Sequence, residues 1–272
     1  LRDGMRLSKA MTYKCAAADE DKGGAKAVIW GDPKKDKTEA LLRTFGRFVE
    51  MLKGRFVTGT DLNITMRDSS IMAKESRYIL GRPKEEGSSG STGITTAYGL
   101  YIGLKACAKS LWGEDSLRGK KIAVQGLGAV GGPLLGYLKE GGLELILTDI
   151  NEKALQQYQA QYQFRVVKPE AIYDVECDIF CPCAVGGILN DQTIPRLKCR
   201  VVAGCANNQL EDEERHGRML HERNILYAPD YIINAGGVIQ VIDEIQGYHP
   251  ERVRMKTERI YDRLLHIFEM AK

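Results

Sequence analysis

The sequence predicts an α/β protein in which a doubly wound parallel sheet follows a smaller α/β domain. Two observations support this fold class. Short apolar segments of strand length alternate with amphipathic helical segments from residue 120 to residue 230, which is typical of a parallel sheet with crossover helices. A Gly/Ser-rich segment at residues 81–93 separates this regular part from a differently organised first part.

The first part alternates helical and strand-like segments. Helices are indicated where apolar residues recur at helical spacing, and strands where short apolar runs stop at Gly, Asp or Pro. The expected helices are 1–18, 37–54 and 69–80, and the expected strands are 25–31 and 55–64.

The segment GRPKEEGSSGSTG at 81–93 is the best linker candidate in the chain. It predicts one domain at residues 1–92 and a second at residues 93–272, whose last helix returns toward the first. The chain begins and ends inside helical patterns, which predicts a piece of a longer protein with an incomplete, N-terminally truncated first domain.

The second part opens with a long helix, followed by the regular alternation. Its expected helices are 95–112, 128–142, 151–162, 211–224 and 260–272. Its expected strands are 120–126, 143–150, 164–167, 177–185, 199–205 and 225–230.

Composition excludes several classes of protein. The 272 residues carry a net charge of +3 without a dense basic block, which argues against nucleic-acid binding, and no apolar run reaches membrane-spanning length. The seven cysteines include no CxxC pair with nearby histidines, so we expect no metal site. Reduced thiols packed as small residues predict a cytoplasmic protein.

A glycine-rich turn provides the first functional signal. Gly126, Gly128 and Gly131 form G-x-G-x-x-G between a predicted strand and helix, and Asp149 ends the next strand 23 residues after Gly126. The glycines permit a tight turn, a close approach to a pyrophosphate and close helix packing, and the carboxylate suits a ribose hydroxyl. A turn without a ligand is the alternative. The Rossmann-like pattern predicts NAD, because Asp149 repels the 2′-phosphate of NADP.

Two lysines with unusually small neighbours provide the second signal. Lys14 precedes Cys-Ala-Ala-Ala, and Lys26 follows Gly-Gly-Ala. Solvated surface positions are the simple interpretation. With Asp61 at a strand end, however, the two cations and one carboxylate suit an amino acid bound in a cleft between the domains. A partly desolvated lysine close to another cation has a lowered pKa and is usable as a base.

Motifs along nearly the whole chain resemble the Glu/Leu/Phe/Val dehydrogenase superfamily, and most closely its leucine dehydrogenase branch, with phenylalanine, valine and tryptophan dehydrogenases as relatives. The motifs are MTYKCAAA, GGAKAVI, GRFVTGTD, TTAYG, AVQGLGAVGG, TDIN, CPCAVGGILN, AGCANNQL and YAPDYIINAGGVI. The resemblance implies reversible NAD-dependent oxidative deamination of an L-amino acid to a 2-oxo acid and ammonia, in a homo-oligomer. The family's glycine-rich segment upstream of the first motif and a further C-terminal stretch do not appear in this chain.

The resemblance also implies the role of each matching residue. Lys14 holds the substrate carboxylate, Lys26 is the catalytic base that activates water, and Asp61 assists proton transfer at the amino group. The implied substrate-binding set is Lys14, Gly59, Asn234, Val238 and Val241. The implied cofactor-binding set is Thr96, Gly126, Leu127, Gly128, Ala129, Val130, Gly131, Asp149, Ile150, Ala206, Asn207 and Asn234.

Three positions bear on the substrate side chain. By the family pattern, Val238 and Val241 match the branched-chain enzymes, whereas Gly59 resembles aromatic-specific relatives and adds space. We therefore favour leucine and other branched-chain substrates, with a phenylalanine or tryptophan dehydrogenase as the alternative. A glutamate dehydrogenase would need a further cation for the side-chain carboxylate. An NAD-binding pseudoenzyme would not need Lys14, Lys26 and Asp61 together.

Overall fold

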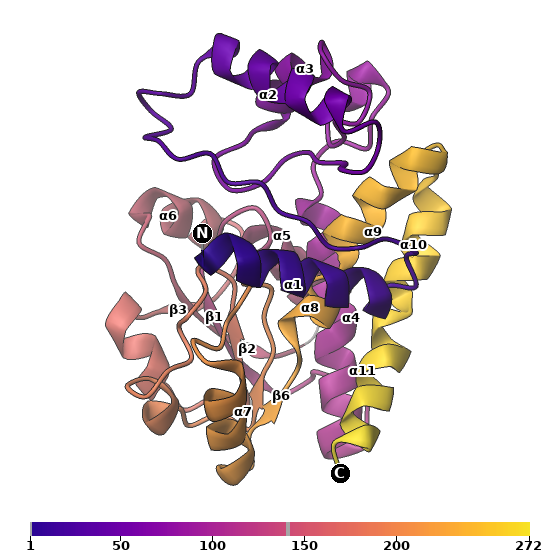
Figure 1. Ribbon diagram of the computed structural model, residues 1–272. Helices are drawn as coiled ribbons and strands as arrows, with labels where there is room; N and C mark the ends of the chain where they lie inside the picture. Colours follow the sequence, from indigo (N-terminus) through magenta and orange to yellow (C-terminus); the bar gives the residue numbers. More distant parts are fainter. Residues whose placement is uncertain (1, 140–141) are drawn as a thin grey trace.

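The computed structural model describes residues 2–139 and 142–272, and its centre is a six-stranded, wholly parallel sheet (Figure 1). The strand order is β3-β2-β1-β4-β5-β6, the doubly wound order in which the chain reverses direction across the sheet between β1 and β4. The strands are β1 (Lys121–Gln125), β2 (Glu144–Thr148), β3 (Arg165–Val166), β4 (Ile179–Pro182), β5 (Val201–Val202) and β6 (Leu226–Tyr227). The fold class predicted from the sequence is confirmed.

Alternation along the strands supplies a core on each face of the sheet. In β1, Ile122 and Val124 belong to the larger core, whereas Ala123 belongs to the smaller core on the other face. Because both faces are covered, the strands are continuously apolar.

The helices of this part are α4 (Gly93–Trp112), α5 (Gly131–Leu138), α6 (Glu152–Gln159), α7 (Glu213–Glu222), α8 (Asp230–Ile233), α9 (Gly236–Asp243), α10 (Pro250–Glu258) and α11 (Ile260–Met270). The short 3₁₀ helices among the described residues are η1 (Lys84–Glu86), η2 (Pro169–Asp174), η3 (Ile194–Arg196) and η4 (Glu244–Gln246).

A small lobe lies above the sheet and is built from α2 (Glu39–Met51) and α3 (Met66–Ala73) (Figure 1). The buried core of this lobe is small and consists of the side chains of Leu42, Val49, Met72 and Ile79. Helix α3 begins at a capping box in which Thr65 and Asp68 satisfy each other's backbone N–H groups. The sequence pattern predicted this helix at residues 69–80, and the capping box was not predicted.

Helix α1 (Arg2–Ala17) lies against the sheet-containing part, not against α2 and α3 (Figure 1). It packs on α8, and the turn that follows it is tied to α10 by an ion pair in which Lys256 Nζ lies 2.6 Å from Glu20 Oε1. The residues just after α1 are therefore held beside the elements that follow the last strand.

The two strands expected in the first part are wrong. Residues 25–31 are irregular, and residues 55–64 contribute only isolated bridges, Thr58 with Ile79 and Asp61 with Ile64. The apolar residues of the first segment are exposed, with Trp30 at 98%. A strand needs a neighbour to take its backbone hydrogen bonds, and no other described segment forms a ladder with residues 25–31.

Residues 81–93 do not form an exposed linker. Ser88 and Ser89 are buried, and the Glu244 carboxylate accepts hydrogen bonds from both of their hydroxyl groups. Gln240 Nε2 adds hydrogen bonds to the carbonyls of Ser89, at 3.1 Å, and Ser91, at 3.3 Å. The connection is therefore fixed by η4 and α9. The predicted helix 128–142 includes residues 140 and 141, which lie outside the described residues.

Candidate active site

The glycine-rich turn between β1 and α5 has the backbone geometry that glycine permits. Gly126 has φ +98°, and a Cβ at Gly131 would lie 2.0 Å from the carbonyl oxygen of Gly126. A Cβ at Gly128 would meet nothing within 4 Å, and Gly128 and Ala129 are exposed. The turn is thus closed on the helix side and open at its crest, as a pyrophosphate cradle requires.

Asp149 lies immediately after β2 and faces this turn. Its Oδ2 accepts a hydrogen bond from the backbone N–H of Leu127 at 2.6 Å, and its Oδ1 accepts one from Asn151 N–H at 2.7 Å. The neighbouring Ile150 is 91% exposed. The carboxylate is therefore oriented by two backbone donors and keeps further lone pairs for ribose hydroxyl groups.

Lys14, near the end of α1, is 7% exposed, so the surface interpretation of this residue is wrong. Its Nζ donates a hydrogen bond to Asn207 Oδ1 at 3.2 Å. Burial lowers the pKa of Lys14 to about 8, partly opposed by the negative charge of Asp230 and reinforced by the positive charge of Lys26. The two lysines of the sequence signal are therefore close enough to interact.

Asn207 connects Lys14 to a second amide. Asn207 Oδ1 also accepts a hydrogen bond from Asn234 Nδ2 at 2.8 Å, and Asn234 Nδ2 donates to the Cys205 carbonyl at 3.0 Å. The buried Oδ1 of Asn234 has no hydrogen-bond partner among the described residues. A buried acceptor of this kind fits a ligand that brings a donor, such as a carboxamide or an ammonium group.

Lys26 and Asp61 form an ion pair between Nζ and Oδ2. The side chain of Lys26 is 20% exposed and that of Asp61 is 44% exposed. The irregular segment that follows α1 carries Lys26, and the turn closed by the Asp61–Ile64 bridge carries Asp61. Lys26 and Asp61 are thus in contact, and Lys14 is close enough to Lys26 for their charges to interact.

The N-terminal end of α9 packs closely on α4 beside Thr96. A Cβ at Gly236 would lie 2.5 Å from the Thr95 carbonyl oxygen, and a Cβ at Gly237 would lie 2.8 Å from Thr96 Oγ1. Val238 and Val241 follow on α9 and are half-buried. The valines are three residues apart, so they share one face of the helix.

Gly59 lies where the backbone passes close to another segment. A Cβ at this position would lie 2.6 Å from the carbonyl oxygen of Leu80, because the backbone runs beside Leu80 here. The absence of a side chain is thus required by this close approach. This packing reason is independent of the substrate, and the expected contribution of Gly59 to the side-chain pocket stays a prediction.

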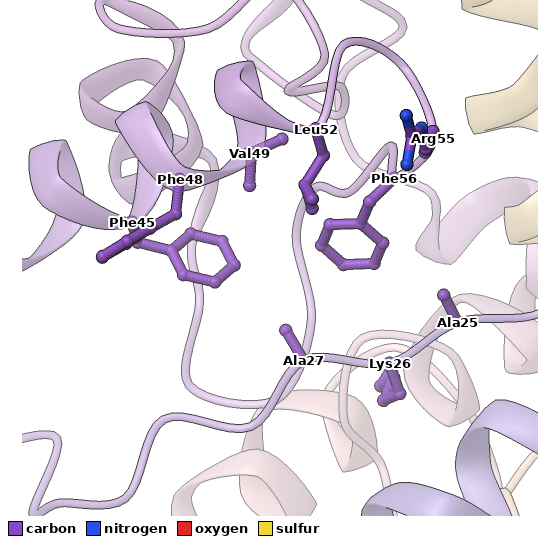
Figure 2. A pocket seen from close by; sticks show the side chains of 9 residues that line it. All are labelled: Ala25, Lys26, Ala27, Phe45, Phe48, Val49, Leu52, Arg55 and Phe56. Carbon is purple, nitrogen blue, oxygen red and sulfur yellow. The ribbon is translucent and has the colours of Figure 1, made fainter.

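An open apolar pocket of about 370 Å³ lies between α2 and residues 25–27. Figure 2 shows Ala25 and Ala27 pointing toward the phenylalanines of this lobe, whereas Lys26 leaves the segment on the other side. The pocket lacks acidic side chains. It is lined by Ala25, Lys26, Ala27, Phe45, Phe48, Val49, Leu52, Arg55 and Phe56.

The comparisons with known proteins agree with these features. Residues 1–84 match the family model for the Glu/Leu/Phe/Val dehydrogenase dimerisation domain, and residues 143–271 match the Glutamate/Leucine/Phenylalanine/Valine dehydrogenase model. The chain is 54% identical over 276 residues to a leucine dehydrogenase of Thermoactinomyces intermedius, covering all of this chain and 74% of that protein. This chain belongs to the Glu/Leu/Phe/Val dehydrogenase family.

Dehydrogenases named for aromatic amino acids are also similar to this chain in sequence. A phenylalanine dehydrogenase of Lysinibacillus sphaericus is 53% identical, with coverage of 100% of this chain and 72% of that protein. The crystal structure of L-tryptophan dehydrogenase from Nostoc punctiforme superposes with a TM-score of 0.84 at 45% identity, covering 100% of this chain and 77% of that one. The chain is accordingly an amino-acid dehydrogenase that depends on a pyridine nucleotide.

Two further properties concern the described part of the chain. No group of three or more His, Cys, Asp or Glu residues there could hold a metal ion. None of its helices combines the length and the apolar character that crossing a membrane demands.

Asp230, the acidic neighbour of Lys14, was not predicted as a site residue from the sequence. Burial raises the pKa of Asp230, and the positive charge of Lys14 opposes that rise. Asp230 lies in the motif YAPDYIINAGGVI, three residues after the end of β6 and at the first position of α8. An acid at the carboxyl end of a parallel strand was the signal that could have identified it.

Proposed function

We propose that this protein catalyses the reversible, NAD-dependent oxidative deamination of an apolar L-amino acid to its 2-oxo acid and ammonia. Residues 1–92 would supply most of the substrate-binding and catalytic side chains, and residues 93–272 would bind the dinucleotide. The observation that carries the proposal is the grouping of buried Lys14, held by Asn207, with the Lys26–Asp61 ion pair. This grouping offers separate partners for the carboxylate and the nitrogen of one amino acid.

Lys14 would bind the substrate carboxylate. Its ammonium group is desolvated and hydrogen-bonded to one neutral amide, so an incoming carboxylate would replace lost hydration with a charge-assisted hydrogen bond. Asn234, whose Oδ1 is buried without a partner, would orient the substrate or the carboxamide of the nicotinamide. Thr96, Ala206 and Asn207 would complete this side of the site.

Lys26 and Asp61 would carry the proton transfers. The bound nicotinamide supplies the acceptor for the hydride that leaves the substrate α-carbon. Lys26 would then remove a proton from the water that attacks the resulting imine, and Asp61 would exchange protons with the departing nitrogen. The contact between the two side chains allows the proton to pass directly between them.

The preference for NAD would rest on Asp149. Its carboxylate is fixed beside the turn by the Leu127 and Asn151 N–H groups, where it would accept hydrogen bonds from ribose hydroxyls and repel a 2′-phosphate. Leu127, Gly128, Ala129, Val130 and Ile150 would line the cofactor along this edge. The protein would act as a homo-oligomer in the cytoplasm, a compartment that suits its seven free cysteines.

Leucine, isoleucine and valine are the favoured substrates. Val238 and Val241 lie on one face of α9, whose N-terminal end packs beside Thr96, and their stiff branched side chains would narrow the pocket. Gly59 weighs toward an aromatic substrate by the family pattern, but its close approach to the Leu80 carbonyl also gives this glycine a packing reason that is independent of the substrate. An aromatic substrate is nevertheless the second candidate, because phenylalanine and tryptophan dehydrogenases are among the similar proteins.

The experiment is a comparison of kcat/KM for L-Leu, L-Val, L-Phe and L-Trp, measured as NADH formation. The expected order places the branched-chain substrates first, with discrimination of about 10- to 200-fold for a methylene-sized difference in fit. A tenfold preference for either aromatic substrate would overturn the branched-chain assignment. Failure to reduce NAD with any of the four would overturn the proposed reaction.

A further inference from the structure

Three thiols meet where β4 and β5 end. The Sγ atoms of Cys181 and Cys183 lie 3.6 Å apart. Cys205 lies beside Cys183, because the Ala206 N–H donates a hydrogen bond to the Pro182 carbonyl at 3.0 Å. Phe180 pairs with Val202 in the parallel ladder, and Cys183 and Cys205 each follow three positions later, which brings the two together. Cys181 is buried, whereas Cys183 and Cys205 are partly exposed.

The surroundings make the three thiols unequal. Hydrogen bonds from Cys181 and Cys205 lower the pKa of Cys183 well below its usual range. The same hydrogen bonds, together with burial, raise the pKa values of Cys181 and Cys205. Cys183 is therefore the most acidic thiol of the group, and an acidic thiol beside a second thiol is the arrangement that oxidants attack selectively.

Cys183 and Cys205 lie between the glycine-rich turn on one side and the hydrogen-bonded group of Lys14, Asn207 and Asn234 on the other. A Cβ at Gly131 would be 3.4 Å from Cys183 Cβ, and a Cβ at Gly126 would be 3.0 Å from Ala184 Cβ, so the Cys183 segment supports the glycine-rich turn. On the other side, the Cys205 carbonyl accepts the hydrogen bond from Asn234. Asn207, which holds Lys14, follows Cys205 by two residues.

We propose that Cys183 and Cys205 are a peroxide-sensitive thiol pair whose oxidation to a disulfide disables the dinucleotide site. The Cys183 thiolate attacks one oxygen of a hydroperoxide, the O–O bond breaks, and Cys183 sulfenic acid forms with release of water or an alcohol. The Cys205 sulfur then attacks the Cys183 sulfur, the S–O bond breaks, and water leaves with the Cys205 proton. The two thiols lose two electrons, and the peroxide gains them.

The disulfide would act through the geometry of the strand ends. Bonded sulfurs lie about 2.0 Å apart, so forming the bond draws Cys183 and Cys205, and with them the ends of β4 and β5, toward each other. Movement at Cys183 displaces the support of Gly126 and Gly131, and movement at Cys205 displaces the acceptor of Asn234. Weaker dinucleotide binding follows from the first displacement, independently of any amino-acid chemistry.

The test treats the protein with hydrogen peroxide and measures NADH affinity by calorimetry before and after dithiothreitol. We expect affinity to fall about tenfold or more, because tightly packed turns tolerate little displacement. Dithiothreitol should restore it, and NADH present during oxidation should slow the loss. Tryptic mapping should join the fragment containing Cys181 and Cys183 to the fragment containing Cys205.

Variants identify the pair. Cys205→Ser should keep its NADH affinity after brief peroxide treatment, whereas Cys199→Ser, which removes a buried thiol outside the group, should respond like the wild type. Cys181→Ala should still form the cross-link. The proposal is overturned if Cys205→Ser loses affinity reversibly at the wild-type rate, if no cross-linked peptide forms, or if the peptide forms without loss of NADH affinity.

Discussion

Replacing Lys14 with methionine should stabilise the protein while abolishing tight substrate binding. Burial lowers the pKa of this lysine from 10.5 to about 8. At about 1.4 kcal/mol per pH unit, the folded state disfavours the charged form by about 3 kcal/mol. Methionine has a similar volume and no charge, so Lys14→Met removes this cost and loses only the hydrogen bond to Asn207, which Asn234 continues to satisfy in part.

The stabilisation has a defined pH dependence. Above the folded pKa of about 8, the folded state releases the Lys14 proton while the unfolded state keeps it up to about 10.5, so wild-type stability gains with rising pH in this window. The cost of the charge therefore falls from about 3 kcal/mol at pH 7 to about 1 kcal/mol at pH 10. The advantage of Lys14→Met over the wild type should shrink by about 2 kcal/mol across the same range.

Urea unfolding at pH 7 and pH 10 measures both quantities. After subtraction of the lost hydrogen bond, a gain of about 1–2 kcal/mol is expected at pH 7. Lys9→Met is the matched control, because Lys9 lies on the same helix in an exposed pair with Glu213, and its unfolding midpoint should follow the wild type at both pH values. The reasoning is refuted if the difference between Lys14→Met and the wild type does not change with pH.

Four other outcomes are expected. KM for the 2-oxo acid, at saturating NADH and ammonia, should rise about tenfold per pH unit above the Lys14 pKa of about 8, because a carboxylate needs the charged lysine; a flat KM would contradict this. Lys26→Ala should lower kcat by about 10²- to 10⁴-fold, as loss of a general base does, while exposed Lys22→Ala keeps wild-type kcat; equal kcat values would return Lys26 to a surface role. Asp149→Ser should raise kcat/KM with NADP relative to NAD, and a wild type that already prefers NADP would exclude this role. Gly93→Ala should weaken NADH binding about tenfold, because its Cβ would lie 2.1 Å from the Ala129 carbonyl oxygen, whereas Gly136→Ala, 3.7 Å from Tyr162, should not.

The sheet and its glycine-rich turn were predictable because their signals are local. Gly126 needs its positive φ, and Gly131 needs its close approach to the Gly126 carbonyl, whatever the rest of the chain does. The alternation of β1 likewise follows from two covered faces. Asp149 could be found from its spacing alone, because the strand that carries it lies beside β1 in the sheet.

The failures concern segments whose state depends on distant partners. Residues 25–31 have strand composition, yet a strand exists only where a neighbouring segment pairs with it. Residues 81–93 have linker composition, yet Glu244 and Gln240 bury their serines across more than 140 residues of sequence. Burial lowers the pKa of Lys14, and its burial by α8 and neighbouring elements could not be read from the small residues around it.

A crystal structure with NADH and a branched-chain 2-oxo acid would test the central claim most directly, because it shows which lysine holds the carboxylate. The account predicts the carboxylate within hydrogen-bond distance of Lys14 Nζ, and the keto oxygen beside Lys26, with Asp61 next to that position. A carboxylate bound to Lys26 instead, or a 2-oxo acid bound away from both lysines, would contradict it.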